Sequence, residues 1–293
     1  MKRLVLSAGI LLFPWQELFA EQVRVTINKK TVYQSEVLKI QLIQKSTAPF
    51  SVNFLGRKHE SFLMGRRQTV LLGIDYQLKL GTYSITGVLK EADNFYFPIY
   101  YKITVREKFP KLKYVPPKRS EKEQARINKE TEEKRAVLER IDYQPDSMGH
   151  FARPVHPAVV NANFGEKRCR DRTLWRRFNC RYHLGIDYRA AFDFFHQRPE
   201  PIRAINNGRV VLTESRIVDG KTVVIDHGYG ISSEYLHLSK FSVKIGEIVK
   251  RGQIIGIAGK TGATEAIHLH LTIKMDNGKT IVDPESFFQA VSK

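Results

Sequence analysis

Short segments rich in β-branched and aromatic residues run through most of this chain, and they constrain its fold more than any other feature. In the first third, residues 23–27 and 96–103 are examples. Turn-forming residues separate such segments at Asn28, Gly65, Gly81 and Asn94. Strands spaced in this way are typical of two antiparallel sheets packed face to face, so we predict a mainly β fold that begins with an immunoglobulin-like β-sandwich of roughly seven strands.

The second half of the chain has the same β character. Strands are predicted at residues 209–213, 222–225, 254–258 and 268–274, with glycines marking tight turns between them. No helical segments alternate with these strands, which argues against a parallel, doubly wound sheet. We therefore predict antiparallel β-sheet from about residue 147 to the C-terminus.

A proline-rich and charged segment separates the two β regions. Pro110, Pro116 and Pro117 precede Ser120, and Glu123 follows three residues later, which is the capping-box pattern of a helix start. A helix is predicted over residues 120–141. Its apolar stripe is thin, so it either braces the two domains or is a charged spacer. The predicted organisation is a β-sandwich at residues 21–106, a linker with a helix at 107–146 and a second domain at 147–293.

The N-terminus and the charge balance indicate where the protein works. Lys2 and Arg3 precede an apolar run at residues 4–13, and Phe19 and Ala20 end a short polar stretch, as in a secretory signal peptide. The run is short for a membrane span, so a retained anchor is the weaker alternative. We predict a signal peptide at residues 1–20 and export to the periplasm or cell surface. The formal net charge of +18 then favours an anionic cell wall, and we expect no nucleic-acid partner.

Histidines near the C-terminus occur in positions suited to a metal site. On a strand, His268 and His270 point to the same face about 6 to 7 Å apart, so both imidazoles can reach one ion. Two hydrophilic residues on a solvated face are the alternative for this pair alone. His183 and Asp187 are further ligands of the type that zinc accepts. In a straight strand they would lie about 13 Å apart, so Gly185 must permit a bend.

Seven ordered motifs lie between His183 and His270, in a match that covers about residues 164–286, and together they are far more specific than any one alone. In chain order they are His183-Leu-Gly-Ile-Asp187-Tyr, Ala204-x-x-x-Gly208-x-Val210, His227-Gly-Tyr-Gly230, Tyr235-Leu-His237-Leu-Ser239, Gly246-x-x-Val249-x-x-Gly252-Gln253, Gly259-x-Thr261-Gly262 and His268-Leu-His270. This succession resembles the lysostaphin/LytM family of zinc metallopeptidases. The resemblance implies a LytM-type peptidase domain at residues 147–293, one zinc ion per chain and bacterial peptidoglycan as the substrate.

The resemblance also implies a role for each motif residue. His183, Asp187 and His270 match the zinc ligands, and His237 and His268 match the catalytic pair. Three protein ligands leave a fourth position open for water, which is the arrangement of catalytic rather than structural zinc. The chain has no H-E-x-x-H motif, so an imidazole must act as the general base. The sequence leaves open whether His237 or His268 does so.

Two further residues are candidates for contact with substrate. Tyr235 either donates to the oxyanion or packs in the core. Arg168 belongs to a basic segment that also holds Cys169 and Cys180. Export would place these cysteines in an oxidising compartment, so we predict a disulfide between them, with two unrelated free thiols as the alternative. The loop closed by this bond is then either an anion-facing clamp for substrate carboxylates or a solvated surface loop.

Other functions fit parts of the sequence. Glu234-x-x-His237 and Glu265-x-x-His268 have the spacing found in di-iron carboxylate proteins, but that site needs four long helices and these pairs have β-rich surroundings. Some LytM-like domains lack their zinc ligands and activate other wall hydrolases, and the intact ligands argue against that function here. In a further alternative, the N-terminal domain or the helix covers the active-site groove until a regulatory partner moves it.

Overall fold

The computed structural model describes residues 25–43, 48–90, 96–110, 119–169, 180–189 and 200–292. The predicted signal peptide and the turn at Asn94 lie outside the described residues. Within these ranges the protein is mainly β, with two helices, as predicted. Neither of the two helices is long and apolar enough to cross a membrane.

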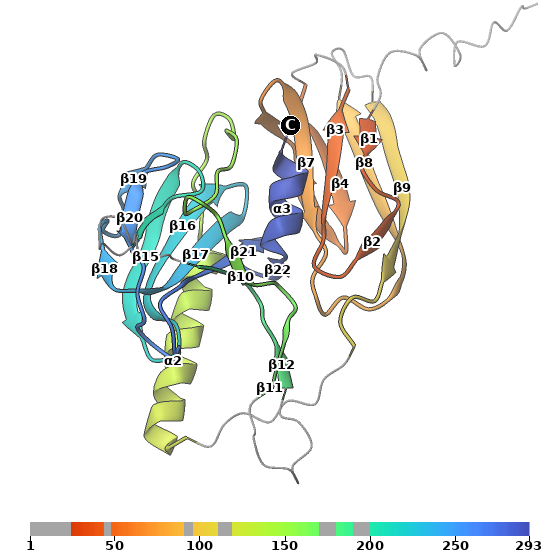
Figure 1. Cartoon of the computed structure of the whole chain (residues 1–293). Helices are drawn as coiled ribbons and strands as arrows, with labels where there is room; N and C mark the ends of the chain where they lie inside the picture. The colour runs from red at the N-terminus through yellow and green to blue at the C-terminus, as the bar shows by residue number, and fades with distance from the viewer. Residues whose placement is uncertain are drawn as a thin grey trace, which may run out of the picture.

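Residues 25–106 form two β-sheets that share one core (Figure 1). One sheet has the order β1-β3-β7-β6 and the other β2-β9-β8-β4-β5, in which only the pair β2-β9 is parallel. The strands are β1 Val25–Ile27, β2 Thr31–Tyr33, β3 Val37–Leu42, β4 Phe50–Phe54, β5 Arg57–Glu60, β6 Phe62–Met64, β7 Arg67–Gly73, β8 Gly81–Lys90 and β9 Tyr96–Arg106. Leu38, Val52 and Ile103 are fully buried between the sheets.

This region has nine strands among the described residues, where the sequence predicted roughly seven. The edge strand β5 explains part of the difference. Its sequence, Arg-Lys-His-Glu, contains no β-branched residue, so it lacks the usual strand pattern. Backbone pairing with β4 nevertheless makes it a strand. The immunoglobulin-like topology stays a prediction.

The second region is built on an eight-stranded antiparallel sheet. Its order is β10-β13-β21-β17-β16-β15-β19, and β22 pairs with β21. These strands are β10 Val160–Ala162, β13 Ile186–Tyr188, β15 Gly208–Arg216, β16 Gly220–Gly228, β17 Ile231–Leu238, β19 Ile248–Val249, β21 Leu269–Met275 and β22 Thr280–Val282. The strands predicted at residues 209–213, 222–225 and 268–274 overlap β15, β16 and β21.

Two smaller sheets flank this main sheet. A hairpin pairs β11 Lys167–Cys169 with β12 Cys180–Tyr182, and it precedes β13 in the chain. A three-stranded sheet has the order β14-β20-β18, with the bounds β14 Pro201–Arg203, β18 Lys240–Phe241 and β20 Ile254–Ile257. The strand predicted at residues 254–258 overlaps β20.

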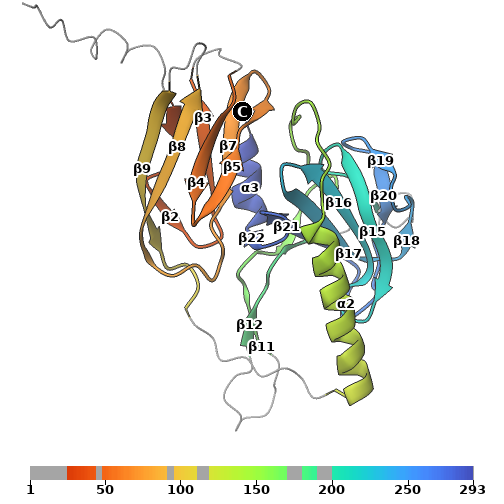
Figure 2. The same ribbon diagram turned by 180° about the vertical axis from the view of Figure 1, so that it is seen from behind.

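Helix α2 (Glu121–Glu139) braces one face of the eight-stranded sheet (Figures 1 and 2). The hydroxyl of its N-cap, Ser120, accepts a hydrogen bond from the backbone nitrogen of Glu123. Leu138, which α2 buries completely, packs against β15 and β16. Lys134 adds an ion pair with Glu234 of β17, with Nζ 3.0 Å from Oε2. Burial alone would raise the pKa of Glu234, but the charges of Lys134 and Lys274 hold it at about 2.

Helix α3 (Pro284–Val291) joins the two β regions, and the sequence analysis did not predict it. In Figures 1 and 2 it stands between the N-terminal sheets and the eight-stranded sheet. Phe287 of α3 belongs to the same buried cluster as Val37 and Phe62 of the N-terminal sheets. The backbone nitrogen of Val37 donates to Ser286 Oγ at 3.0 Å, in a buried position. The two β regions therefore pack against each other through apolar contacts, while the domain limits at residues 106 and 147 stay predictions.

Candidate metal centre and active site

The alternation of side chains along β21 separates the candidate site from the core. Leu269, Leu271 and Ile273 are fully buried in the apolar cluster, so His270 and Thr272 point to the opposite face of the sheet. Asp187 of β13 pairs directly with His270 across the strands. His183 lies four residues before Asp187, ahead of a bend at Gly185.

Three donor atoms converge at this point. His183 Nε2 lies 2.9 Å from His270 Nδ1 and 3.0 Å from Asp187 Oδ1. His270 Nδ1 lies 2.9 Å from the same carboxylate oxygen. His183 and Asp187 are each 4% exposed, so water cannot readily satisfy these atoms. His183 and Asp187 are thus far closer than the roughly 13 Å that would separate them on a straight strand.

The hydrogen-bond partners assign the tautomer of each imidazole. His183 Nδ1 faces the backbone oxygen of Asn163 at 2.9 Å, and a carbonyl oxygen can only accept, so Nδ1 carries the proton. His270 Nε2 lies 3.0 Å from Thr272 Oγ1. The Thr272 hydroxyl donates its own proton to Leu184 O, so its oxygen accepts from Nε2. The lone pairs of His183 Nε2 and His270 Nδ1 therefore both point at Asp187 Oδ1.

Such a set of lone pairs fits a metal ion. Arg168 donates a charge-assisted hydrogen bond to Asp187 Oδ2, which favours the ionised carboxylate. One carboxylate oxygen and two imidazole nitrogens are ligands that zinc prefers, and a tetrahedral zinc with ligands at about 2 Å would separate them by roughly 3.3 Å. The second nitrogen of each imidazole is held by a hydrogen bond, as is usual for metal-binding histidines.

His237 and His268 lie beside this set, with their ring centroids 5.0 Å apart. His237 Nδ1 lies 2.9 Å from the backbone oxygen of Thr261, and His268 Nδ1 lies 2.9 Å from that of Ala266. Both Nδ1 atoms must therefore donate, which leaves a lone pair on each Nε2. Burial lowers the pKa of His237 to about 4, so this imidazole is neutral at pH 7.

The four histidines, His183, His237, His268 and His270, line one groove of about 940 Å³. Tyr76 of the N-terminal region and Phe109, just after that region, lie in its wall, and Lys134 of α2 also lines it. The two segments predicted as covers of the active site, the N-terminal region and the helix, thus both border the groove.

Part of this chain is similar to known peptidases. Residues 181–284 match the model of peptidase family M23. Lysostaphin from Staphylococcus staphylolyticus is 36% identical over 115 residues, which are 37% of this chain and 24% of lysostaphin. Peptidoglycan DD-endopeptidase ShyA from Vibrio cholerae is 44% identical over 78 residues, which are 27% of this chain and 18% of ShyA. The chain carries an M23 peptidase domain.

A solved structure extends the likeness beyond the M23 domain. A protein from Pseudomonas aeruginosa assigned to the M23 peptidases aligns with 90% of this chain and 96% of its own, with a TM-score of 0.64 and 24% identity. At that identity the match concerns the fold alone. The matched segments cover less than a third of lysostaphin and of ShyA.

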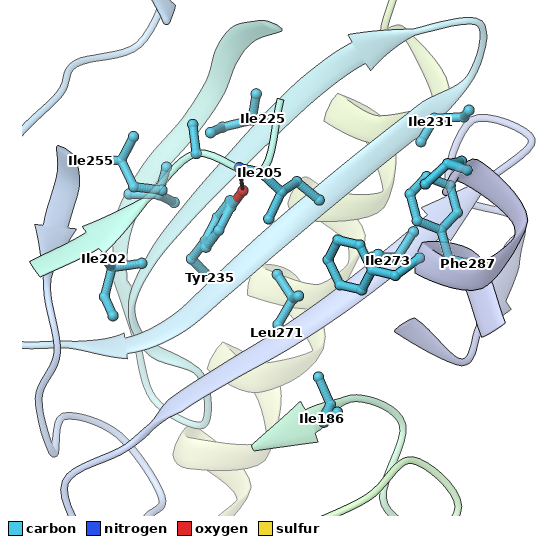
Figure 3. Close-up of a cluster of buried hydrophobic side chains, with 14 of the residues drawn as sticks. Ile186, Ile202, Ile205, Ile225, Ile231, Tyr235, Ile255, Leu271, Ile273 and Phe287 are labelled. Atoms are coloured by element: carbon cyan, nitrogen blue, oxygen red, sulfur yellow. Dashed lines mark hydrogen bonds between the residues drawn. The ribbon is translucent and has the colours of Figure 1, made fainter. Parts of the chain in front are cut away.

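Tyr235 does not lie in the groove of the M23 domain. Its side chain is fully buried in the apolar cluster on the other face of the sheet (Figure 3). Its hydroxyl oxygen accepts hydrogen bonds from the backbone nitrogen of Ile205 at 2.9 Å and from Ser233 Oγ at 3.0 Å. This correction follows from strand alternation, because Tyr235 shares the core face with Ile231. Of the two predictions for Tyr235, packing in the core agrees with the structure.

Arg168 is already occupied by a contact within the protein, since its guanidinium donates to Asp187 Oδ2. The neighbouring Cys169 forms a disulfide with Cys180, and these two residues face each other across the β11–β12 hairpin. Arg181 lies opposite Arg168 on β12, and the arginines at residues 170–177 lie outside the described residues.

The surroundings of Glu234 and Glu265 do not fit a di-iron site. Glu234 lies on a strand and pairs with Lys134 and Lys274, while Glu265 is exposed. Neither glutamate lies on a helix.

The sequence analysis missed two residues that orient the donor set, Thr272 and Asn163. The sequence could have indicated Thr272, because it lies two residues after His270 and therefore shares the same face of a strand. No sequence pattern indicates Asn163, because it acts through its backbone oxygen.

Gly185 is needed at its position because of close packing. A Cβ atom there would lie 2.6 Å from Cε1 of His270 and 2.7 Å from the backbone oxygen of Leu271. We expect Gly185→Ala to push His270 out of the donor set. Overpacking costs about 1–3 kcal/mol, which corresponds to roughly a tenfold to hundredfold loss of zinc affinity.

Competition with a chromophoric chelator measures this loss. The matched control is Gly149→Ala, because a Cβ at Gly149 meets only Asn206 Oδ1, at 3.5 Å. Wild-type zinc affinity in Gly185→Ala would show that His270 does not depend on this close approach.

Proposed function

We propose that this protein is a zinc-dependent peptidase that hydrolyses peptide cross-links or stem peptides of bacterial peptidoglycan. The observation that carries the proposal is the convergence of three lone-pair donors, from His183, Asp187 and His270, next to two further imidazoles. The similarity of the M23 domain to a peptidoglycan DD-endopeptidase supports the substrate class.

In this proposal His183, Asp187 and His270 hold one zinc ion per chain. When bound, zinc acts as a Lewis acid toward the scissile carbonyl and lowers the pKa of the attacking water. The Nε2 atoms of His237 and His268 carry lone pairs and line the same groove, so each can accept the proton of that water. One of them acts as the general base, and the other must first bind a proton at Nε2 before it donates a hydrogen bond or a proton to the substrate.

The groove and the charge of the chain suit an anionic peptide. A volume of about 940 Å³ is large enough for several residues of a peptide. The net charge of +18 attracts a polymer that carries carboxylates. A secretory signal at residues 1–20 would bring the protein to this substrate, in the periplasm or at the cell surface.

The intact donor set does not favour a non-catalytic activator of other wall hydrolases. Regulation by a partner protein is compatible with the proposed activity, because Lys134 of α2 and Gln77 of the N-terminal region border the groove. We propose that such a partner would act by moving α2, which is docked chiefly through Leu138 and the Lys134 ion pairs.

A digest of purified peptidoglycan tests the proposed function. The zinc-loaded protein should release fragments whose masses correspond to cleavage of a peptide bond, as resolved by mass spectrometry. Chelation should stop the release, and added zinc should restore it. If a protein with one zinc per chain releases no new fragment, the proposed activity is wrong.

A further inference from the structure

Arg168 is held over the candidate metal site by the β11–β12 hairpin. In this hairpin Arg168 pairs with Arg181, and the disulfide between Cys169 and Cys180 closes the next pair. The backbone nitrogen of His183 donates to the oxygen of Glu166 at 2.9 Å, so the same hairpin also leads directly into the donor set. The position of Arg168 relative to the site is therefore set by backbone pairing and a covalent bond.

The two oxygens of Asp187 have separate partners. Oδ1 faces His270 Nδ1 at 2.9 Å and His183 Nε2 at 3.0 Å. Oδ2 accepts a hydrogen bond from Arg168 Nη2. The Asp187 side chain is only 6% exposed, so solvent does not compete for Oδ2. A charge-assisted hydrogen bond of this kind fixes the rotation of the carboxylate.

We propose that Arg168 is a positioning residue, which holds the outer oxygen of Asp187 so that Oδ1 stays directed at His183 and His270. This inference rests on the proposed zinc site. It differs from the expected role of Arg168 as a contact for substrate carboxylates, which stays a prediction, because the guanidinium already binds a carboxylate of the protein. Hydrogen-bond partners of metal ligands typically contribute about 10-fold to 100-fold to metal affinity.

The direction in which zinc affinity changes when Arg168 is replaced separates a positioning role from a purely electrostatic one. A guanidinium close to a cation site repels the cation, so removal of its charge alone should raise zinc affinity. Removal of a positioning contact should lower zinc affinity, because Asp187 is then free to rotate. The direction of this change also tests whether Arg168 blocks the metal site. If it did, replacing it would make zinc bind more tightly.

The test compares zinc affinity in the full chain by competition with a chromophoric chelator. Arg168→Gln should lower the affinity about 10-fold to 100-fold. Arg168→Lys should lower it less, because one charged donor remains. Arg181→Gln is the matched control, because Arg181 is the exposed cross-strand neighbour of Arg168. Its affinity should stay the same or rise slightly. Thermal unfolding of the metal-free variants checks that each of them is folded.

Three outcomes would overturn the inference. Zinc affinity in Arg168→Gln that is equal to or tighter than wild type would show that Arg168 does not position Asp187. An equal loss in Arg181→Gln would assign the effect to the hairpin as a whole. If the wild-type protein binds no zinc, the proposed metal site is wrong as well. The first two outcomes, in contrast, reject only the role of Arg168 and leave the zinc site in place.

Discussion

Replacing His183, Asp187 or His270 by alanine should abolish zinc binding and peptidoglycan hydrolysis. Each residue supplies one of the three donor atoms that lie within about 3 Å of one another. Loss of a direct ligand should cost more than the roughly 100-fold that outer partners contribute at most. Metal analysis of the dialysed protein should find about one zinc per wild-type chain and essentially none in the variants.

The N-terminal sheets should stay folded in these variants, because their own core contains none of the three residues. Circular dichroism and thermal unfolding of the metal-free proteins check this expectation. His150→Ala is the matched control for loss of a histidine, because His150 is exposed and accepts a hydrogen bond from Arg251 through its backbone oxygen. Full zinc occupancy in His183→Ala, Asp187→Ala or His270→Ala would remove that residue from the ligand set.

His237→Ala and His268→Ala should keep zinc and lose most of their turnover. Each imidazole has its Nδ1 proton tied to a backbone oxygen and its Nε2 lone pair free, so each is prepared for proton transfer. General acid–base residues contribute about 10² to 10⁴ in rate, and we expect kcat to fall by that factor. Zinc content and kcat, measured on the same samples, separate this loss from loss of the metal.

The backbone at His237 calls for a second variant. Its φ of 64° lies in the left-handed region, where alanine is strained and asparagine is better tolerated. His237→Asn should therefore be as inactive as His237→Ala while unfolding at a temperature closer to wild type. If either His237→Asn or His268→Ala hydrolyses peptidoglycan at the wild-type rate, the catalytic role assigned to that histidine is wrong.

The sequence predicted the parts of this protein that depend on local pattern. Period-two alternation in residues 268–274 predicted that His268 and His270 share one face, and His270 does lie opposite the core residues of β21. Ser120 and Glu123 predicted the start of α2 within one residue. The ordered motifs predicted a peptidase domain, and residues 181–284 match the M23 family. Each of these patterns involves residues that are close together in the sequence, so it can be recognised without knowledge of the fold.

Tertiary structure alone decided how distant segments meet. Packing of α3 against β3 joined the two β regions, although nothing near Pro284 or Val37 specifies that partner. The residues of β5 have little preference for a strand. Strand β5 forms because its backbone pairs with that of β4. The hairpin directed Arg168 to Asp187, 19 residues away, where charge alone had suggested a contact with substrate. Side-chain contacts between residues far apart depend on the register and direction of whole strands, and local sequence patterns do not encode these.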